Sequence, residues 1–146
     1  MHRMTSDEFF ASPRGLYDLM FVDGLHQEAQ VARDLLNGLS VLAPGGTIVA
    51  HDCNLVTEFA QTEAPNGGVW NGTVWKSWLR LRATRADLSM IVVDIDHGCG
   101  VLRGGRQELY PLPETLDFAF FDEHRKEALP LVSVDTFLSD LLSWDA

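Results

Sequence analysis

The spacing of hydrophobic residues changes several times along the chain, and each change predicts a new helix or strand. The apolar run Tyr17–Val22 precedes an Asp-Gly pair, which is typical of a strand that is buried on both faces and ends in a turn. From Gln27 onward, apolar residues recur at i, i+3, i+4 and i+7, which predicts an amphipathic helix that ends by Pro44. Thr47–Ala50 then predicts a second short strand. This order predicts a βαβ unit with two parallel strands.

The second half of the chain predicts a long loop and five further elements. Residues 54–72 are rich in Gly, Pro, Asn and Thr, which indicates a long loop of the kind that often carries function. Asn71 is placed to cap the helix that follows this loop. The further elements are a helix over 73–83, strands over 88–95 and 99–102 that form a hairpin, and helices over 117–128 and 133–142.

The two ends of the chain are expected to belong to the same domain. Thr5 and Glu8 have the spacing of a capping box, so residues 1–15 are expected to contain a short helix and a lead-in to the first strand. The two C-terminal helices fall within residues 113–146. No repeat or linker interrupts the 146 residues, so one α/β domain is expected over residues 1–146.

The composition of the chain excludes some classes of binding partner. The chain has 11 Lys and Arg against 21 Asp and Glu, and the resulting net charge of -10 repels nucleic-acid phosphates and anionic membranes. No apolar run approaches the roughly 18 residues of a membrane helix, and Met1–Phe10 lacks the order of a signal peptide. Cys53 and Cys99 have no C-x-x-C spacing, which favours reduced thiols. We therefore expect a cytoplasmic protein that binds neither nucleic acid nor membrane.

Polar side chains follow both of the predicted parallel strands. Asp23 follows the first strand and Asp52 the second, and the carboxyl ends of parallel strands meet at the sheet edge where α/β proteins bind ligands. His26 lies three residues after the first acid, so an imidazole joins the two carboxylates. A histidine beside carboxylates can take a proton from a hydroxyl and generate the alkoxide that attacks an electrophilic carbon. His26 is therefore the candidate catalytic base, with Asp23 as its partner.

Other residues near these acids are candidates for binding a metal or a substrate. Oxygen atoms of Asp23, Asp52 and Asn54 would suit a hard cation such as Mg²⁺, which would acidify the hydroxyl. His51, Trp70 and Trp75 are candidates for contact with the substrate. Each candidate also has a structural interpretation: the acids as turn or cap residues, His51 as a packed strand end, and the tryptophans as core residues.

Four motifs resemble a known protein family. Residues 17–26, YDLMFVDGLH, and residues 42–54, LAPGGTIVAHDCN, resemble the fourth- and fifth-strand regions of class I S-adenosylmethionine-dependent methyltransferases. The likeness is greatest to small-molecule O-methyltransferases. It continues through WNGTVWK at 70–76 and DHGCGV at 96–101, and it covers most of residues 16–106.

The resemblance implies both a fold and a reaction. The fold would be a partial Rossmann-like methyltransferase sheet, consisting of the last four strands as a parallel pair plus a C-terminal antiparallel hairpin, with flanking helices. The reaction would transfer a methyl group from S-adenosylmethionine to a hydroxyl of a small-molecule acceptor. Asp23 and Asp52 match the metal-binding acids of related metal-dependent enzymes, and His26 matches the base position. Cys53 stands where those enzymes have the Asn of an Asp-Asn pair, so metal-dependent and metal-free reactions both stay open.

The resemblance also implies that a part is missing. The donor site of this family uses a Gly-rich loop after the first strand and an acid after the second, and no segment before Tyr17 matches either. The chain alone is therefore expected to lack the donor-binding half and to be inactive. Its first strand would lie at an open sheet edge, which favours a homo-oligomer formed through that edge. The alternative is a non-catalytic, oligomerising or vestigial module that keeps only the scaffold.

Overall fold

The computed structural model describes residues 3–65 and 67–141. Within these ranges, five strands form one mixed sheet in the order β1-β2-β4-β3-β5. The elements in chain order are α1 (Ser6–Phe10), β1 (Tyr17–Val22), α2 (Glu28–Ser40), β2 (Leu42–Ala50), a 3-10 helix (Glu58–Gln61), α3 (Val74–Thr84), β3 (Leu88–Val93), β4 (Cys99–Gly104), α4 (Phe118–Ala128), β5 (Leu131–Val132) and α5 (Val134–Leu141).

The strand directions confirm the predicted parallel pair and hairpin. β1 pairs in parallel with β2, and β4 pairs antiparallel with both β2 and β3. The short strand β5, which was not predicted, adds to β3 in parallel. Its two residues are too few to show a period of their own in the sequence.

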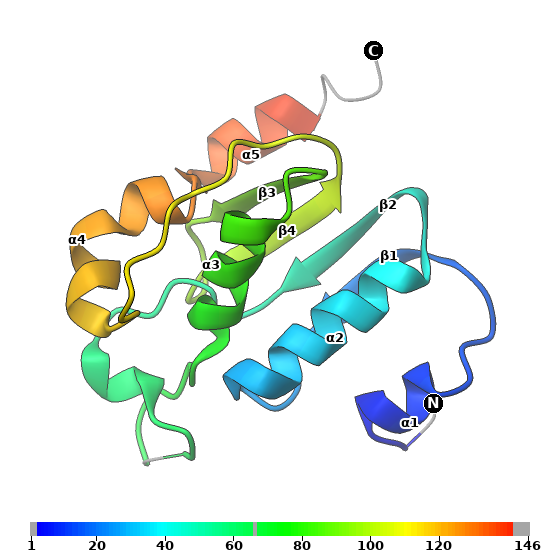
Figure 1. The fold of residues 1–146 in the computed structure, drawn as a ribbon, viewed down its shortest axis with the longest axis horizontal. Coiled ribbons are helices and arrows are strands. Elements are labelled where there is room, and N and C mark those ends of the chain that lie inside the picture. Colours follow the sequence, from blue (N-terminus) through cyan, green and yellow to red (C-terminus); the bar gives the residue numbers. More distant parts are fainter. Residues whose placement is uncertain (1–2, 66, 142–146) are drawn as a thin grey trace.

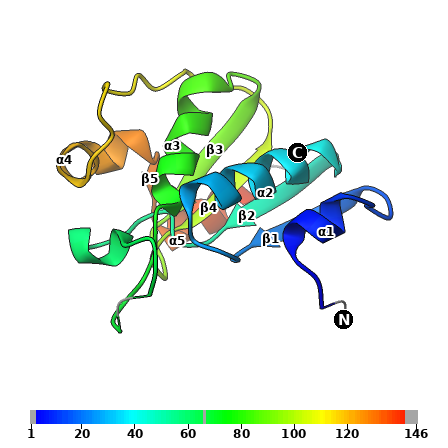
Figure 2. The ribbon, with the colours of Figure 1, turned by 60° about the horizontal axis from the view of Figure 1, so that its bottom comes forward.

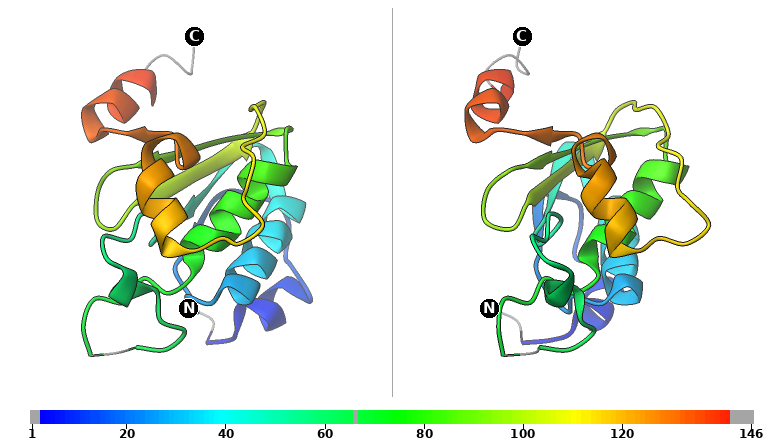
Figure 3. Two further views of the ribbon diagram at one scale, coloured as in Figure 1. Left: turned by 60° about the vertical axis from the view of Figure 1, so that its left-hand side comes forward. Right: turned by 90° about the vertical axis from the view of Figure 1, so that its left-hand side faces the viewer.

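Helices lie on both sides of the sheet, but none of the described residues of α5 is buried. Figures 1 and 3 show α2 and α3 on one face and α5 on the other. Gly38 lets α2 approach the sheet, because a Cβ at this position would lie 3.0 Å from Cδ1 of Ile48. Trp75 and Trp78 of α3 are completely buried in the same core. Figure 2 shows α1 beside α2 at the β1 edge of the sheet.

The Pro-Gly-Gly sequence lies inside β2 and does not precede it as predicted. Tyr17 pairs with Leu42, but Leu19 pairs with Thr47, so the extra residues of β2 form a bulge. Gly45 adopts a φ of 78° in this bulge, a conformation that side chains with a Cβ rarely adopt. A bulge accommodates a proline because some of its residues donate no ladder hydrogen bond.

The expected terminal helices are present. Thr5 Oγ1 accepts a hydrogen bond from the backbone N–H of Glu8 at 3.2 Å, and Thr5 N–H donates to Glu8 Oε2 at 2.7 Å, which confirms the capping box. The helix expected over 133–142 is α5, and its last expected residue lies outside the described ranges. No helix of the described ranges is long and apolar enough to cross a membrane.

The prediction that β1 is buried on both faces is wrong. The side chains of Leu19 and Phe21 are 68% and 63% exposed. They alternate with Met20, which packs toward α2, so they point to the opposite face of the sheet. α5 lies toward the other edge of the sheet and leaves this face of β1 uncovered (Figures 1 and 3).

We propose that a second copy of the chain covers β1, because an edge strand presents unpaired backbone groups beside these apolar side chains. Phe21→Lys is expected to convert the oligomer to a monomer in size-exclusion chromatography with light scattering. Leu36→Lys is the control, because Leu36 is an exposed apolar residue on α2, and it should leave the mass unchanged. A monomeric wild-type protein would contradict the proposal.

Candidate functional site

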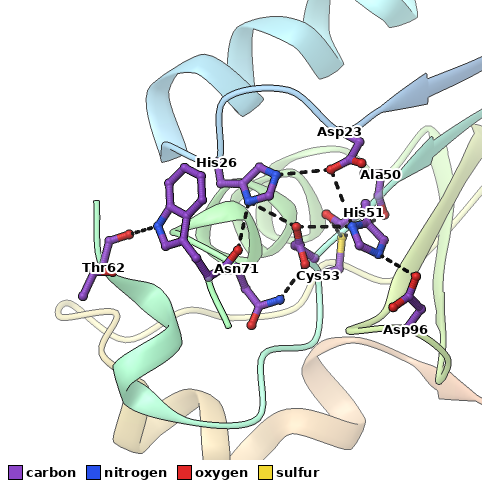
Figure 4. A network of polar contacts seen from close by, with 10 residues as sticks. Asp23, His26, Ala50, His51, Cys53, Thr62, Asn71 and Asp96 are labelled. Atoms are coloured by element: carbon purple, nitrogen blue, oxygen red, sulfur yellow. Dashed lines mark hydrogen bonds and ion pairs between the residues drawn. The ribbon is translucent and has the colours of Figure 1, made fainter. Parts of the chain in front are cut away.

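The predicted acids and base meet at the carboxyl ends of β1 and β2. His26 Nε2 lies 3.2 Å from Asp23 Oδ1, and His26 Nδ1 lies 3.2 Å from Asp52 Oδ2 (Figure 4). The backbone N–H of His51 donates to the carbonyl of Val22 at 3.0 Å, which continues the pairing of β1 and β2 up to the site. The parallel register thus brings together residues that lie far apart in sequence.

His51 belongs to the same network. Its Nδ1 lies 3.5 Å from Asp23 Oδ1 and 3.3 Å from Asp52 Oδ2, the two oxygen atoms that also contact His26. Its Nε2 lies 3.3 Å from Oδ2 of Asp96, which belongs to the turn between β3 and β4. Two imidazoles therefore share two carboxylates, and a third acid lies at the outer end of the network.

Asp52 is the buried centre of this network. It is only 3% exposed, and its Oδ1 accepts a hydrogen bond from Asn71 Nδ2 at 2.5 Å. Its φ of 64° lies in the left-handed region, which Asp tolerates better than most residues. The next two N–H groups, of Cys53 and Asn54, donate to the β3–β4 turn at 3.0 and 2.7 Å. These bonds fix the backbone that carries the carboxylate.

Trp70 covers the face of His26. The two rings stack with centroids 4.7 Å apart and an interplanar angle of 20°. The Trp70 carbonyl oxygen lies 3.2 Å from His26 Nδ1, and Trp70 Nε1 donates to the carbonyl of Thr62 at 2.6 Å. The long loop therefore contributes to the site, as the sequence suggested.

The structure places two candidate residues away from the network. Asn54 Nδ2 donates to Asp94 Oδ1 at 3.1 Å, and Asn54 Oδ1 accepts from Arg125 Nη1 at 2.7 Å. The side chain of Asn54 therefore ties the loop after β2 to β3 and α4. Trp75 is fully buried in the core, with its ring 4.6 Å from that of Phe121.

A cation would meet a different set of donors from the one predicted. Ligand atoms of Asp23, His51 and Asp52 lie within 4.8 Å of one another. Two carboxylates with an imidazole suit a transition metal better than Mg²⁺, which prefers oxygen ligands alone. Cys53 adds no thiolate, because burial raises the pKa of its thiol.

The pKa of His51 is raised. Burial of the ring opposes protonation, but the negative charges of Asp52, Asp23 and Asp96 outweigh it and hold the pKa of His51 above its ordinary value. A raised pKa in the folded state stabilises the fold fully below the unfolded value of about 6.5, and this stabilisation is lost as pH rises through the folded value.

The melting temperature is therefore expected to fall as pH rises from about 6 to about 8. His51→Gln should flatten this part of the profile, because a neutral amide gains no proton. His124→Gln on α4 is the control and should leave the profile unchanged. Scanning fluorimetry over this pH range measures the difference, and identical profiles for wild type and His51→Gln would refute the assignment.

Two residues of the network were missed by sequence reasoning. Asn71 was expected to cap α3, but the N-cap is Thr73, and the Asn71 side chain bonds to Asp52 instead. The hairpin predicted over 88–95 and 99–102 places Asp96 in its turn and gives it no part in the site. Its position in a turn is confirmed by the 2.8 Å bond from Gly98 N–H to the carbonyl of Ile95. The pairing of β4 with β2, which brings this turn near His51, has no local signal in the sequence.

A comparison with family models finds one similarity. Residues 1–53 match a family model described as a methyltransferase domain. The matched segment contains β1, α2 and β2, together with Asp23, His26, His51 and Asp52. No curated protein matches the chain. The match supports methyl transfer as the general activity, and S-adenosylmethionine is the donor that methyltransferase domains generally use.

Proposed function

We propose that the chain is the acceptor-binding part of an S-adenosylmethionine-dependent O-methyltransferase, in which His26 takes the proton from a small-molecule hydroxyl. The observation that carries the proposal is the position of His26 between two carboxylates at the ends of adjacent parallel strands. The similarity of residues 1–53 to a methyltransferase domain supports it.

The contacts of His26 indicate which nitrogen acts as the base. We assign the proton of the neutral ring to Nδ1, because the carbonyl oxygen of Trp70, 3.2 Å away, can only accept a hydrogen bond. The lone pair is then on Nε2, which faces Asp23 Oδ1 at 3.2 Å. Two acceptors side by side require a donor, and a substrate hydroxyl entering beside the partly exposed Asp23 would supply it.

Proton transfer follows from this arrangement. The O–H bond of the hydroxyl breaks, its proton moves to Nε2, and the oxygen keeps the electron pair. The resulting imidazolium lies between Asp23 and Asp52, whose negative charges stabilise it. S-adenosylmethionine, when bound, supplies the electrophilic methyl group. We propose that residues beyond this network, in another segment or another chain, hold the donor.

A cavity beside Asp23 fits a small-molecule acceptor. It has a volume of about 800 Å³, a size found for small-molecule sites, and it lies between α1 and β1. Phe9, Phe10 and Tyr17 line it together with Asp23. Aromatic walls beside an acidic end favour an acceptor with an apolar body and a hydroxyl group.

The test is a transfer assay on the complete protein. Labelled S-adenosylmethionine is supplied with a panel of phenols, sugars and other hydroxylated compounds, and each acceptor is paired with an analogue that lacks the hydroxyl. Label is expected in an O-methyl product and absent with the analogue. Transfer to nitrogen or carbon, or no transfer to any acceptor, would overturn the proposal.

A non-catalytic oligomerising module is the second candidate, and the exposed apolar side chains of β1 favour it. Calorimetry with S-adenosylmethionine distinguishes the two. Donor binding by the complete protein supports the enzyme, whereas a complete protein that forms the β1-dependent oligomer and binds no donor supports the module.

A further inference from the structure

We infer that the four residues Trp70–Thr73 form a clamp that positions the catalytic base, and that Asn71 within it is a positioning residue for Asp52. The inference rests on the proposed function, because it concerns the base of that reaction. Its physical basis is that one short segment contacts both His26 and the buried carboxylate beside it.

Two members of the clamp, Trp70 and Thr73, hold His26. Trp70 stacks on the imidazole and offers its carbonyl oxygen to Nδ1. The backbone N–H of Thr73 donates to the carbonyl of His26 at 2.8 Å. The hydroxyl oxygen of Thr73 also accepts from the N–H of Glu28 at 2.7 Å, where α2 begins. Both the ring and the backbone of His26 are therefore fixed by residues from a distant part of the sequence.

Gly72 allows the clamp to lie in direct contact with His26. Its φ is 61°, and a Cβ at this position would lie 2.0 Å from the carbonyl oxygen and 2.5 Å from the Cβ of His26. Any side chain would therefore push the two segments apart. This close approach explains why the segment carries a glycine where it contacts the base.

Asn71 holds the second partner of the base. It is only 1% exposed, and its Nδ2 donates to Asp52 Oδ1 at 2.5 Å. This bond leaves the other oxygen, Oδ2, directed at His26 and His51. Asn71 therefore sets the rotation of the carboxylate that stabilises the imidazolium.

Hydrogen bonds to the long loop hold the clamp in place. The N–H groups of Asn71 and Gly72 both donate to the carbonyl oxygen of Ala60, each at 2.9 Å. Trp70 Nε1 adds the bond to Thr62. Because these bonds involve neither His26 nor Asp52, the clamp can impose a position on both.

Asn71→Leu in the complete protein tests the positioning role. This substitution keeps the size of the side chain but removes the donated N–H, so Asp52 loses the bond that orients it. We expect kcat to fall roughly 10-fold or more while KM changes little, because a hydrogen bond to a charged group is lost. A merely structural role would instead lower the melting temperature and leave kcat per folded protein unchanged, which would overturn the inference.

Gly72→Ala tests the close approach to His26. Gly45→Ala is a matched control, because Gly45 has a similar φ of 78° and open space around the position of a Cβ. We expect Gly72→Ala to abolish most activity and Gly45→Ala to retain it. Equal activity in the two variants would refute the clamp.

Nitrogen-15 chemical shifts of the His26 ring separate this inference from the proposed function. The wild type should show the proton on Nδ1, and Gly72→Ala should show a mixture of both tautomers. A wild type that transfers no methyl group would refute the proposed function. An unchanged tautomer in Gly72→Ala would refute the positioning role.

Discussion

Replacing His26 by alanine should lower kcat for O-methyl transfer by roughly 100- to 10,000-fold, the range that general base catalysis contributes. The reason is that, among the described residues, only His26 places one ring nitrogen at the Trp70 carbonyl oxygen and the other at Asp23. His51 shares the carboxylates, but its second nitrogen faces Asp96 and lies away from the stacked tryptophan. Steady-state kinetics on the complete protein measures the loss.

Two further variants show whether the loss comes from the base itself. His26→Asn places an amide N–H near the position of Nδ1, so it can still donate to Trp70 but cannot take a proton. It should therefore be as inactive as His26→Ala. His124→Ala on α4 removes a histidine outside the network and should keep full activity. Substantial activity in His26→Asn would refute the assignment of the base.

The parts of the site that could be predicted from sequence depend on local pattern and one topological rule. The apolar run of β1, the period of α2 and the short run in β2 indicate a βαβ unit. Parallel strands place their carboxyl ends together. Asp23, Asp52 and His26 were therefore placed correctly, because each lies within a few residues of a strand end or helix start.

The remaining parts depend on contacts between distant segments. Asn54 follows Asp52 by two residues, yet the left-handed φ of Asp52 turns the chain toward β3 and α4. Asn71 follows a long loop whose path has no periodic signal, so its bond to Asp52 could not be predicted. The exposure of Phe21 could not be predicted from its strand alone, because an apolar run does not specify which of its faces are covered.

The position of His51 could be predicted from the sequence, but its contacts could not. The sequence put it at the end of β2 and suggested a contact with substrate. In the structure, its ring touches both acids that contact His26 and a third acid on the β3–β4 turn. The network therefore couples the charge on His51 to the carboxylates that stabilise His26.

Asp52→Ala should be the most destabilising change in the site, with an expected loss of about 2–5 kcal/mol in the free energy of unfolding. Asn71 Nδ2 would be left buried without its acceptor, and both imidazoles would lose a contact at 3.2–3.3 Å. Alanine would also have to adopt the φ of 64°. Urea unfolding measures the change.

Asp52→Asn separates the charge of this residue from its shape. Asparagine tolerates the left-handed conformation, so the loss of stability should be smaller than with alanine. Asp52 contributes the largest of the charges that raise the pKa of His51. In Asp52→Asn, the fall in melting temperature from about pH 6 to about pH 8 should therefore shrink, and kcat should fall because the imidazolium of His26 loses one counter-charge. If Asp52→Asn kept the wild-type pH profile and kcat, the carboxylate would be only a structural acceptor for Asn71, and the two histidines would act independently.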